Sequence, residues 1–401
     1  MIHEIKELTA EAAKFSAWNA IWTFPSIIAS ALVIAWGAES AQFLVSQGFA
    51  LTMLALIQTL PEFAVEGVIA WRAGQIPTPE NIGLATANFT GALRLLVGLG
   101  WPLIYYVAAI FNIKGKQRKG NLEPIHLDKE HSVELMGFFV PTLYMFIIVL
   151  KASLTIYDSI ILFMMYLVYV SILLRMPAME AERVDEAEPI PRYILTRNRW
   201  KRNIIIWLCF LTGGGAIYLV ADPFLNSMLG LSVVVGVPAF VFVQWVAPFL
   251  SEFPEKVSAF YWAKTVKKSP MALMNMVSSG IAELTLLVGI IPVIYCISRG
   301  GIYPINFDWP HRVEILLTAT QSLLGFLLLA NLQFKAYEAI GLFLLFVVQF
   351  IKPTIREEII IIYAGWIILE LVLIFVGNRK IYAFSEFKKV YNKHIRKPKP
   401  A

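Results

Sequence analysis

Five glutamates lie inside apolar segments of this 401-residue chain, and they are the residues best suited to chemistry: Glu62, Glu66, Glu252, Glu255 and Glu283. A charged side chain at the centre of a bilayer costs at least about 2.5–3.5 kcal/mol on insertion scales. Spacings of four residues between the first two and three between the next two place each pair on one helix face. Packing such carboxylates together is unfavourable unless a cation or a proton neutralises them. The pattern therefore predicts a buried cation or proton site.

Neutral oxygen ligands lie close to these acids in the sequence. Ca²⁺ binds several oxygens from carboxylates, carbonyls and hydroxyls. Pro61 and Pro254 each directly precede a glutamate and free backbone carbonyls beside it. We predict a metal site that comprises Glu62, Glu255, Glu283, Thr59, Asn88, Ser251, Ser278 and Ser279. Possible additional members are Glu66, Glu252 and Arg94.

The acids belong to two similar stretches of sequence. Each stretch has a Pro-Glu pair, then a short polar break, then Leu-Leu-Val-Gly, which ends at Gly98 in the first and at Gly289 in the second. Glu62 lies 36 residues before the first of these glycines, and Glu255 lies 34 before the second. Two landmarks in the same order at nearly equal spacing indicate an internal repeat.

The elements that must position these residues are membrane-spanning helices. The chain is 58% hydrophobic and 15% charged, with a mean hydropathy of +0.66, which excludes a soluble globular protein. Three of the candidate spans are too long for straight crossings of a bilayer core of roughly 30 Å, so they must tilt or break at their prolines and glycines. The eleven candidate spans are 17–36, 41–71, 81–111, 134–151, 154–174, 203–221, 230–263, 270–297, 313–331, 335–351 and 358–377.

The distribution of basic residues predicts the orientation. If the N-terminus is outside and the C-terminus is cytoplasmic, the inner segments hold 24 lysines and arginines and the outer segments hold 8. The Pro-Glu spans are then the second and the seventh, so they run in opposite directions, as in an inverted repeat. Glu62 lies about 15 Å from the outer face and Glu255 about 13.5 Å from the inner face, which places both near the midplane.

The same pattern divides the chain into parts. We expect an N-terminal half at 1–174 with the first Pro-Glu repeat at about 50–110. A charged cytoplasmic linker at 175–202 precedes a C-terminal half at 203–377, which holds the second repeat at about 240–300 and one extra helix. A basic cytoplasmic tail occupies 378–401, where contact with lipid headgroups is the plain interpretation and regulation by anionic lipid the sharper one.

The segments LPEFAVEG and FPEKVSAF resemble the Pro-Glu motifs of the Na⁺/Ca²⁺ exchanger family, within the cation/Ca²⁺ exchanger superfamily. ANFTGALRLLVGLG and SSGIAELTLLVG resemble degenerate forms of the motif that follows in each of its repeats. The resemblance implies a divergent member of the family, an all-α polytopic membrane protein of two inverted five-helix repeats plus an additional C-terminal helix. It also implies an alternating-access antiporter that exchanges Ca²⁺, or a similar cation, for Na⁺, with Glu62 and Glu255 as central ligands.

Three departures from the family pattern bear on the transported ions. Ala92 supplies no ligand where the family has a polar residue. Arg94 is a fixed cation in the motif helix, and it either pairs with a carboxylate or lines a polar crevice. Lys256 lies near the inner end of its span, where it can extend toward the headgroups.

Two alternatives to Na⁺-coupled exchange remain at this stage. The crowded carboxylates and Arg94 also fit a proton-coupled exchanger, and a non-transporting membrane sensor would bind the ion without moving it. No nucleophile or metal constellation of an intramembrane enzyme lies at membrane depth, so we expect no enzyme and no cofactor. The expected partners are membrane lipid and inorganic cations, not nucleic acid, and the oligomeric state is open. Asp158, Glu338 and Glu370 are expected to be hydrogen-bond partners between helices.

Overall fold

The fold is known from a computed structural model that describes residues 12–44, 56–57, 59–115, 122–176, 184 and 187–396. The helices of the first half are α2 (Ala20–Gln42), α4 (Leu60–Gln75), α5 (Pro79–Leu95), α6 (Trp101–Gly115), α7 (Ser132–Lys151) and α8 (Ile156–Leu173). Then come α9 (Pro189–Leu195), α10 (Arg199–Val235), α11 (Ala239–Ser251), α12 (Phe253–Lys264), α13 (Ser269–Ala282), α14 (Val288–Arg299), α15 (Trp309–Leu329), α16 (Ala336–Ile351), α17 (Arg356–Phe375) and α18 (Ala383–Tyr391). Four two-residue strands are β1 (Ile125–His126), β2 (Ser153–Leu154), β3 (Ile305–Asn306) and β4 (Gln333–Phe334).

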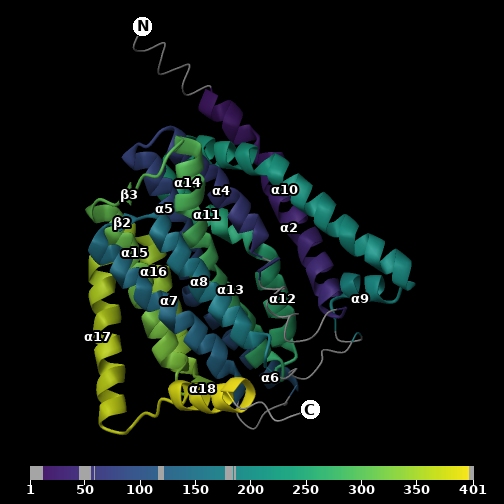
Figure 1. The fold of residues 1–401 in the computed structure, drawn as a ribbon, viewed down its shortest axis with the longest axis vertical. Helices are drawn as coiled ribbons and strands as arrows, with labels where there is room; N and C mark the ends of the chain where they lie inside the picture. Colours follow the sequence, from purple (N-terminus) through teal and green to yellow (C-terminus); the bar gives the residue numbers. More distant parts are fainter. Residues whose placement is uncertain are drawn as a thin grey trace.

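The protein is a helical, multi-pass membrane protein. Among the described residues, eight helical stretches are long and apolar enough to cross a membrane, and α11 and α16 are shorter apolar helices. Helices α2 and α10 lie side by side along one edge of the molecule, and α17 lies at the opposite edge (Figure 1). The number of eleven spans stays a prediction, because the span expected at 41–71 falls partly outside the described residues. The eight stretches are Ala12–Gln42, Pro79–Asn112, Lys129–Lys151, Ile156–Leu173, Arg199–Val235, Ser269–Arg299, Trp309–Leu329 and Pro353–Phe375.

Two strand pairs show that the halves are inverted. Strand β1 precedes α7 and β2 follows it, while β3 precedes α15 and β4 follows it. β1 pairs with β4 and β2 pairs with β3, both antiparallel. The start of α7 therefore lies beside the end of α15, so these two packed helices run in opposite directions. A twofold axis that exchanges the halves maps one strand pair onto the other, as the inverted repeat predicts.

Loops predicted to share a side of the membrane lie together. The β1–β4 pair joins two segments expected inside, and the β2–β3 pair joins two expected outside. Helix α18, in the predicted inner tail, lies across the end of the bundle and packs on α7 (Figure 1). The backbone N–H groups of Tyr382 and Ala383 donate to the carbonyl of Ala330 at the β4 end. The relative sidedness of these loops thus agrees with the prediction, and their placement toward the cell interior stays a prediction.

The two Pro-Glu motifs begin new helices. Helix α11 ends at Ser251 and α12 starts at Phe253, with Glu252 between them and Pro254 in the first turn. Helix α4 starts at Leu60 with Pro61 in its first turn. Proline is tolerated there because the first N–H groups of a helix have no partner within it. The break expected in the seventh span is therefore present. Glu62 and Glu255 each lie in the first turn of a helix, next to its positive N-terminal end.

The boundary between the sixth and seventh spans differs from the expected one. Helix α10 runs from Arg199 to Val235, about 55 Å, whereas the sequence predicted spans at 203–221 and 230–263. Pro223 stays inside the helix, and the chain turns only at Gly236, where φ is +76°. A positive φ is readily adopted by glycine because it has no Cβ. The seventh span thus begins at α11.

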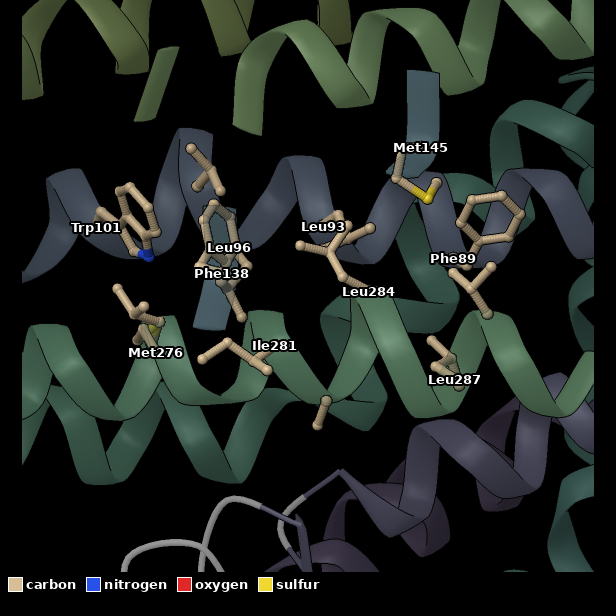
Figure 2. Packing of buried hydrophobic residues seen from close by; sticks show 14 of the residues in the cluster. Phe89, Leu93, Leu96, Trp101, Phe138, Met145, Met276, Ile281, Leu284 and Leu287 are labelled. Carbon is tan, nitrogen blue, oxygen red and sulfur yellow. The ribbon is translucent and has the colours of Figure 1, made fainter. Parts of the chain in front are cut away.

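The centre of the molecule is formed by the two motif helices packed against each other. A π-helical turn, Leu96–Gly100, joins α5 to α6, and a second, Glu283–Leu287, joins α13 to α14. Figure 2 shows the apolar side chains that fill this interface: Phe89, Leu93, Leu96 and Trp101 on one helix, Met276, Ile281, Leu284 and Leu287 on the other, and Phe138 and Met145 from α7. Nearby, a Cβ on Gly91 of α5 would lie 1.9 Å from the carbonyl oxygen of Gln244 on α11, so these two backbones are in direct contact.

Candidate ion-binding site

Three carboxylates from separate segments meet in the interior. Glu62 lies in the first turn of α4, Glu252 at the α11–α12 junction and Glu283 at the first position of the second π-helical turn. One carboxylate oxygen of each lies within 4.8 Å of the other two, and all three side chains are buried. Glu62 comes from the first half of the chain and the other two from the second. The fold thus gathers acids that are up to 221 residues apart into one cluster.

Two more acids adjoin this cluster. Electrostatic repulsion couples Glu62 with Glu252, Glu66 and Glu255, and couples Glu283 with Glu255. Within the described part of the chain, no hydrogen-bond donor reaches either carboxylate oxygen of Glu62 or Glu283. Burying a carboxylate without a donor is costly, so this arrangement requires a cation or protons. The pair expected at the centre was Glu62 and Glu255. The structure groups Glu62 with Glu252 and Glu283, and Glu255 lies beside this group.

Residues with hydroxyl groups lie close to the acids in the chain or in the fold. Thr59 Oγ1 donates to the carbonyl of Leu56 at 2.9 Å, and Ser251 Oγ donates to that of Ala247 at 2.9 Å. Each hydroxyl has one proton, so these two oxygens keep lone pairs for a cation. Ser279 lies beside Glu255, and its buried Oγ faces that carboxylate.

Asn88 contacts one of the acids, whereas Ser278 contacts a neighbouring helix. Asn88 Nδ2 donates to Glu66 Oε2 at 2.7 Å, and the Asn88 Oδ1 is buried with no partner in the described regions. This amide oxygen is therefore a further acceptor next to the acids. Ser278 is half-buried and its Oγ lies 3.2 Å from the hydroxyl of Tyr169 on α8. Adjacent helical residues point about 100° apart, which explains why Ser279 faces Glu255 and Ser278 contacts α8.

Lys256 corrects one expectation. The sequence predicted that its side chain extends toward the headgroups, but the side chain is buried and its Nζ forms an ion pair with Glu252. The reason is local, because residues four apart on a helix are neighbours, and the partner carboxylate lies at the helix start. The spacing of Glu252 and Lys256 was the signal that could have revealed this pair.

Arg94 pairs with an acid outside the predicted site. Its Nη2 donates to Glu314 Oε2 at 2.7 Å, and its Nη1 donates to Gln349 at 3.3 Å. Its guanidinium also lies 5.0 Å from the centre of the Trp245 ring. Arg356 forms an ion pair with Glu314 as well. Of the two sequence interpretations, pairing with a carboxylate is therefore confirmed, but the carboxylate is Glu314. Arg94 and Glu314 are 220 residues apart, so no local sequence pattern pointed to this pair.

The isolated acids behave as expected. Asp158 accepts a hydrogen bond from Tyr144 on the neighbouring helix at 2.7 Å and from Lys151 at 2.5 Å. Glu338 and Glu370 both form ion pairs with Arg379, which ties α16 and α17 to the segment before α18. These acids serve as structural partners between helices.

Comparison with known proteins gives consistent results. Residues 15–175 and 205–351 match the model of the sodium/calcium exchanger protein family. The solved structure of the H⁺/Ca²⁺ exchanger CAX is 30% identical with a TM-score of 0.85, over 97% of this chain and 95% of that chain. Two structures of the sodium-calcium exchanger NCX_Mj show a similar fold. One, soaked with 10 mM Na⁺ and zero Ca²⁺, is 14% identical with a TM-score of 0.53 over 86% of this chain and 99% of that chain. The other, soaked with 2.5 mM Na⁺ and 0.1 mM Sr²⁺, is 15% identical with a TM-score of 0.55, over 85% and 99%. No curated protein matches.

Proposed function

Because this chain belongs to the sodium/calcium exchanger protein family, a family of cation/Ca²⁺ antiporters, we propose that it moves Ca²⁺ in exchange for protons through the buried carboxylate site. The observation that carries the proposal is the cluster of Glu62, Glu252 and Glu283, with an oxygen from each within 4.8 Å. Three buried carboxylate oxygens at this separation suit a hard divalent cation that prefers oxygen ligands.

The neighbouring residues supply the remaining ligands for the transported ion. Ca²⁺ takes six to eight oxygens, and the hydroxyls of Thr59, Ser251 and Ser279 provide neutral ones near the acids. The ion compensates the repulsion among the carboxylates when it binds, and protons compensate it when the ion leaves. A carboxylate can hold either, so the two occupants exclude each other.

Alternating access follows from the inverted halves. The site includes residues from both halves, and it lies where α4 and α12 begin and where the helix of the second motif has a π-helical turn. Such interruptions at the interface of inverted repeats are how secondary transporters form ion sites. A rocking movement of one half against the other would expose the site first to one side and then to the other.

The coupling ion is either H⁺ or Na⁺. The sequence alone favoured Na⁺, and the fold of this chain is shared with NCX_Mj. The likeness to the H⁺/Ca²⁺ exchanger extends over 97% of this chain at 30% identity, against 14–15% for the two NCX_Mj structures above. This difference supports protons, and Na⁺ is the second candidate. We further propose that the protein resides in the cell membrane with its N-terminus outside and its C-terminus in the cytoplasm.

Flux measurements in proteoliposomes test the proposal. Ca²⁺ uptake is measured under an imposed pH gradient and, separately, under an imposed Na⁺ gradient. We expect the pH gradient to drive uptake and the Na⁺ gradient not to. Glu62→Gln and Glu283→Gln should abolish the driven uptake, while Glu80→Gln, the same change at an exposed residue at the start of α5, should not.

Each other result has a defined meaning. Uptake that follows only Na⁺ selects the second candidate. Ca²⁺ binding without uptake under either gradient identifies a non-transporting sensor and refutes antiport. Uptake that persists in Glu62→Gln and Glu283→Gln removes the carboxylate cluster from the mechanism.

A further inference from the structure

Lys256 brings a positive charge into the carboxylate cluster. Its side chain is 8% exposed and its Nζ is paired with Glu252 Oε2. The backbone N–H of Lys256 also donates to the carbonyl of Glu252 at 3.2 Å, so both residues are held in the first turn of α12. The ammonium is close enough to influence Glu62, Glu255 and Glu283 electrostatically. It is therefore a member of the ion site and not a surface charge.

The other oxygen of Glu252 remains available. Glu252 Oε1 is buried and has no hydrogen-bond partner in the residues that the structure describes. Glu252 can thus contribute one oxygen to a transported ion while the ammonium holds the other. A buried ammonium at this position fills space and neutralises a carboxylate charge. A mobile monovalent cation would otherwise occupy that space and bind that carboxylate.

The first repeat lacks this arrangement. When Pro61 is aligned with Pro254, Thr59 matches Glu252 and Phe63 matches Lys256. The second repeat therefore adds one acid and one base where the first has two neutral residues. The net charge is unchanged, but the acid joins the cluster at the cost of a permanently attached counter-ion. Such a pair is not needed to start a helix, because α4 begins at the same motif without it.

We propose that Lys256 is a built-in monovalent cation of the transport site, which weakens Ca²⁺ binding and excludes one mobile monovalent cation, Na⁺ in particular. The inference rests on the proposed function and specifies its ion selectivity. The ammonium acts here as a fixed charge that stays with the protein in every step of the cycle. It makes Lys256 a specificity-determining residue.

The test compares neutral and charge-retaining variants of the full-length protein. Lys256→Met and Lys256→Gln remove the charge, and the glutamine can still donate to Glu252. Lys256→Arg keeps the charge, and Lys267→Met is a matched control at an exposed lysine. Ca²⁺ affinity is measured by calorimetry in choline buffer, with and without Na⁺, at one fixed pH. The charge moved per Ca²⁺ is measured in proteoliposomes.

We expect both neutral variants to bind Ca²⁺ at least about tenfold more tightly, because an opposing charge near a divalent ion is gone. Added Na⁺ should then reduce their affinity toward that of the unmodified protein, since it can occupy the vacated position. With Na⁺ present, a mobile cation carried in place of the fixed ammonium should change the charge moved per Ca²⁺ by one elementary charge. Lys256→Arg and Lys267→Met should leave all three values near their original ones.

Failure of the inference about Lys256 and failure of the proposed function give different results. If the unmodified protein exchanges Ca²⁺ but folded Lys256→Met and Lys256→Gln match it in affinity, Na⁺ response and charge moved, the lysine is only a structural partner and the inference is overturned. If the unmodified protein neither binds nor exchanges Ca²⁺, the proposed function itself fails.

Discussion

Gly91 provides the sharpest test of how the ion site is held together. A Cβ at this position would lie 1.9 Å from the carbonyl oxygen of Gln244 and 2.8 Å from its carbon. Ordinary contacts begin at about 3.4 Å, so Gly91→Ala must push α5 and α11 apart by roughly 1.5 Å. Helix α5 carries Asn88, and α11 ends at Ser251, next to Glu252. The substitution therefore separates ligands on two sides of the site.

The energetic cost can be bounded. Overpacking a tight interior costs typically about 1–3 kcal/mol, and a clash with backbone belongs at the upper end because it cannot rotate away. Alanine restores about 1 kcal/mol through its higher helix propensity. The net loss of about 2 kcal/mol should lower the thermal unfolding midpoint by about 2 °C. Ca²⁺ affinity should fall as well, because the ligands on α5 and α11 move apart.

The assay is a thermal melt of purified protein in detergent, followed by Ca²⁺ titration. Gly214→Ala is the matched control, since no described atom outside the backbone of its own helical turns and its two chain neighbours lies within 4 Å of the position where its Cβ would be. We expect Gly214→Ala to melt at or above the original temperature. If Gly91→Ala melts and binds Ca²⁺ as Gly214→Ala does, the contact between α5 and α11 does not support the site.

Three more predictions follow from the site. Ca²⁺ affinity should rise with pH, because only deprotonated carboxylates bind the ion and protons are lost as pH increases; titrations at two pH values with equal affinity would contradict shared carboxylates. Ser279→Ala should weaken Ca²⁺ binding severalfold while Ser278→Ala should not, since Ser279 lies beside Glu255 and Ser278 contacts Tyr169; equal losses in calorimetry would remove this distinction. Glu314→Gln should destabilise the protein by about 3 kcal/mol, because it leaves Arg94 without its counter-charge; a melting temperature matching that of Glu80→Gln would show that the ion pair contributes little.

Several structural features could be predicted because their causes are local. The apolar runs predicted membrane helices, and the prolines beside Glu62 and Glu255 predicted interruptions of the long spans, because proline removes a helix hydrogen bond. The opposite directions of the repeats followed from counting spans between them. The direction of the repeats depends only on whether the number of spans that separates them is odd or even, and here it is odd. The pairing of strand β1 with strand β4 confirms the inversion directly.

Other features were mispredicted or missed because they depend on partners distant in the sequence. Arg94 and Glu314 are 220 residues apart, so no local pattern could have assigned that ion pair. The long α10 was expected to end near 221, because hydropathy does not distinguish one 37-residue helix from two shorter ones.

The sequence by itself determined that the helices lie in a membrane, that the chain contains a repeat, and which residue types form the site. These features depend on the hydrophobicity, the prolines and the glutamates of short segments. The tertiary structure decided which oxygens meet. Glu62 comes together with Glu252 and Glu283, and not first with its repeat equivalent Glu255, because three separate helix interruptions converge at one point. It also decided that the carboxylate of Glu252 is buried, so that the local pair with Lys256, one helical turn away, lies inside the ion site.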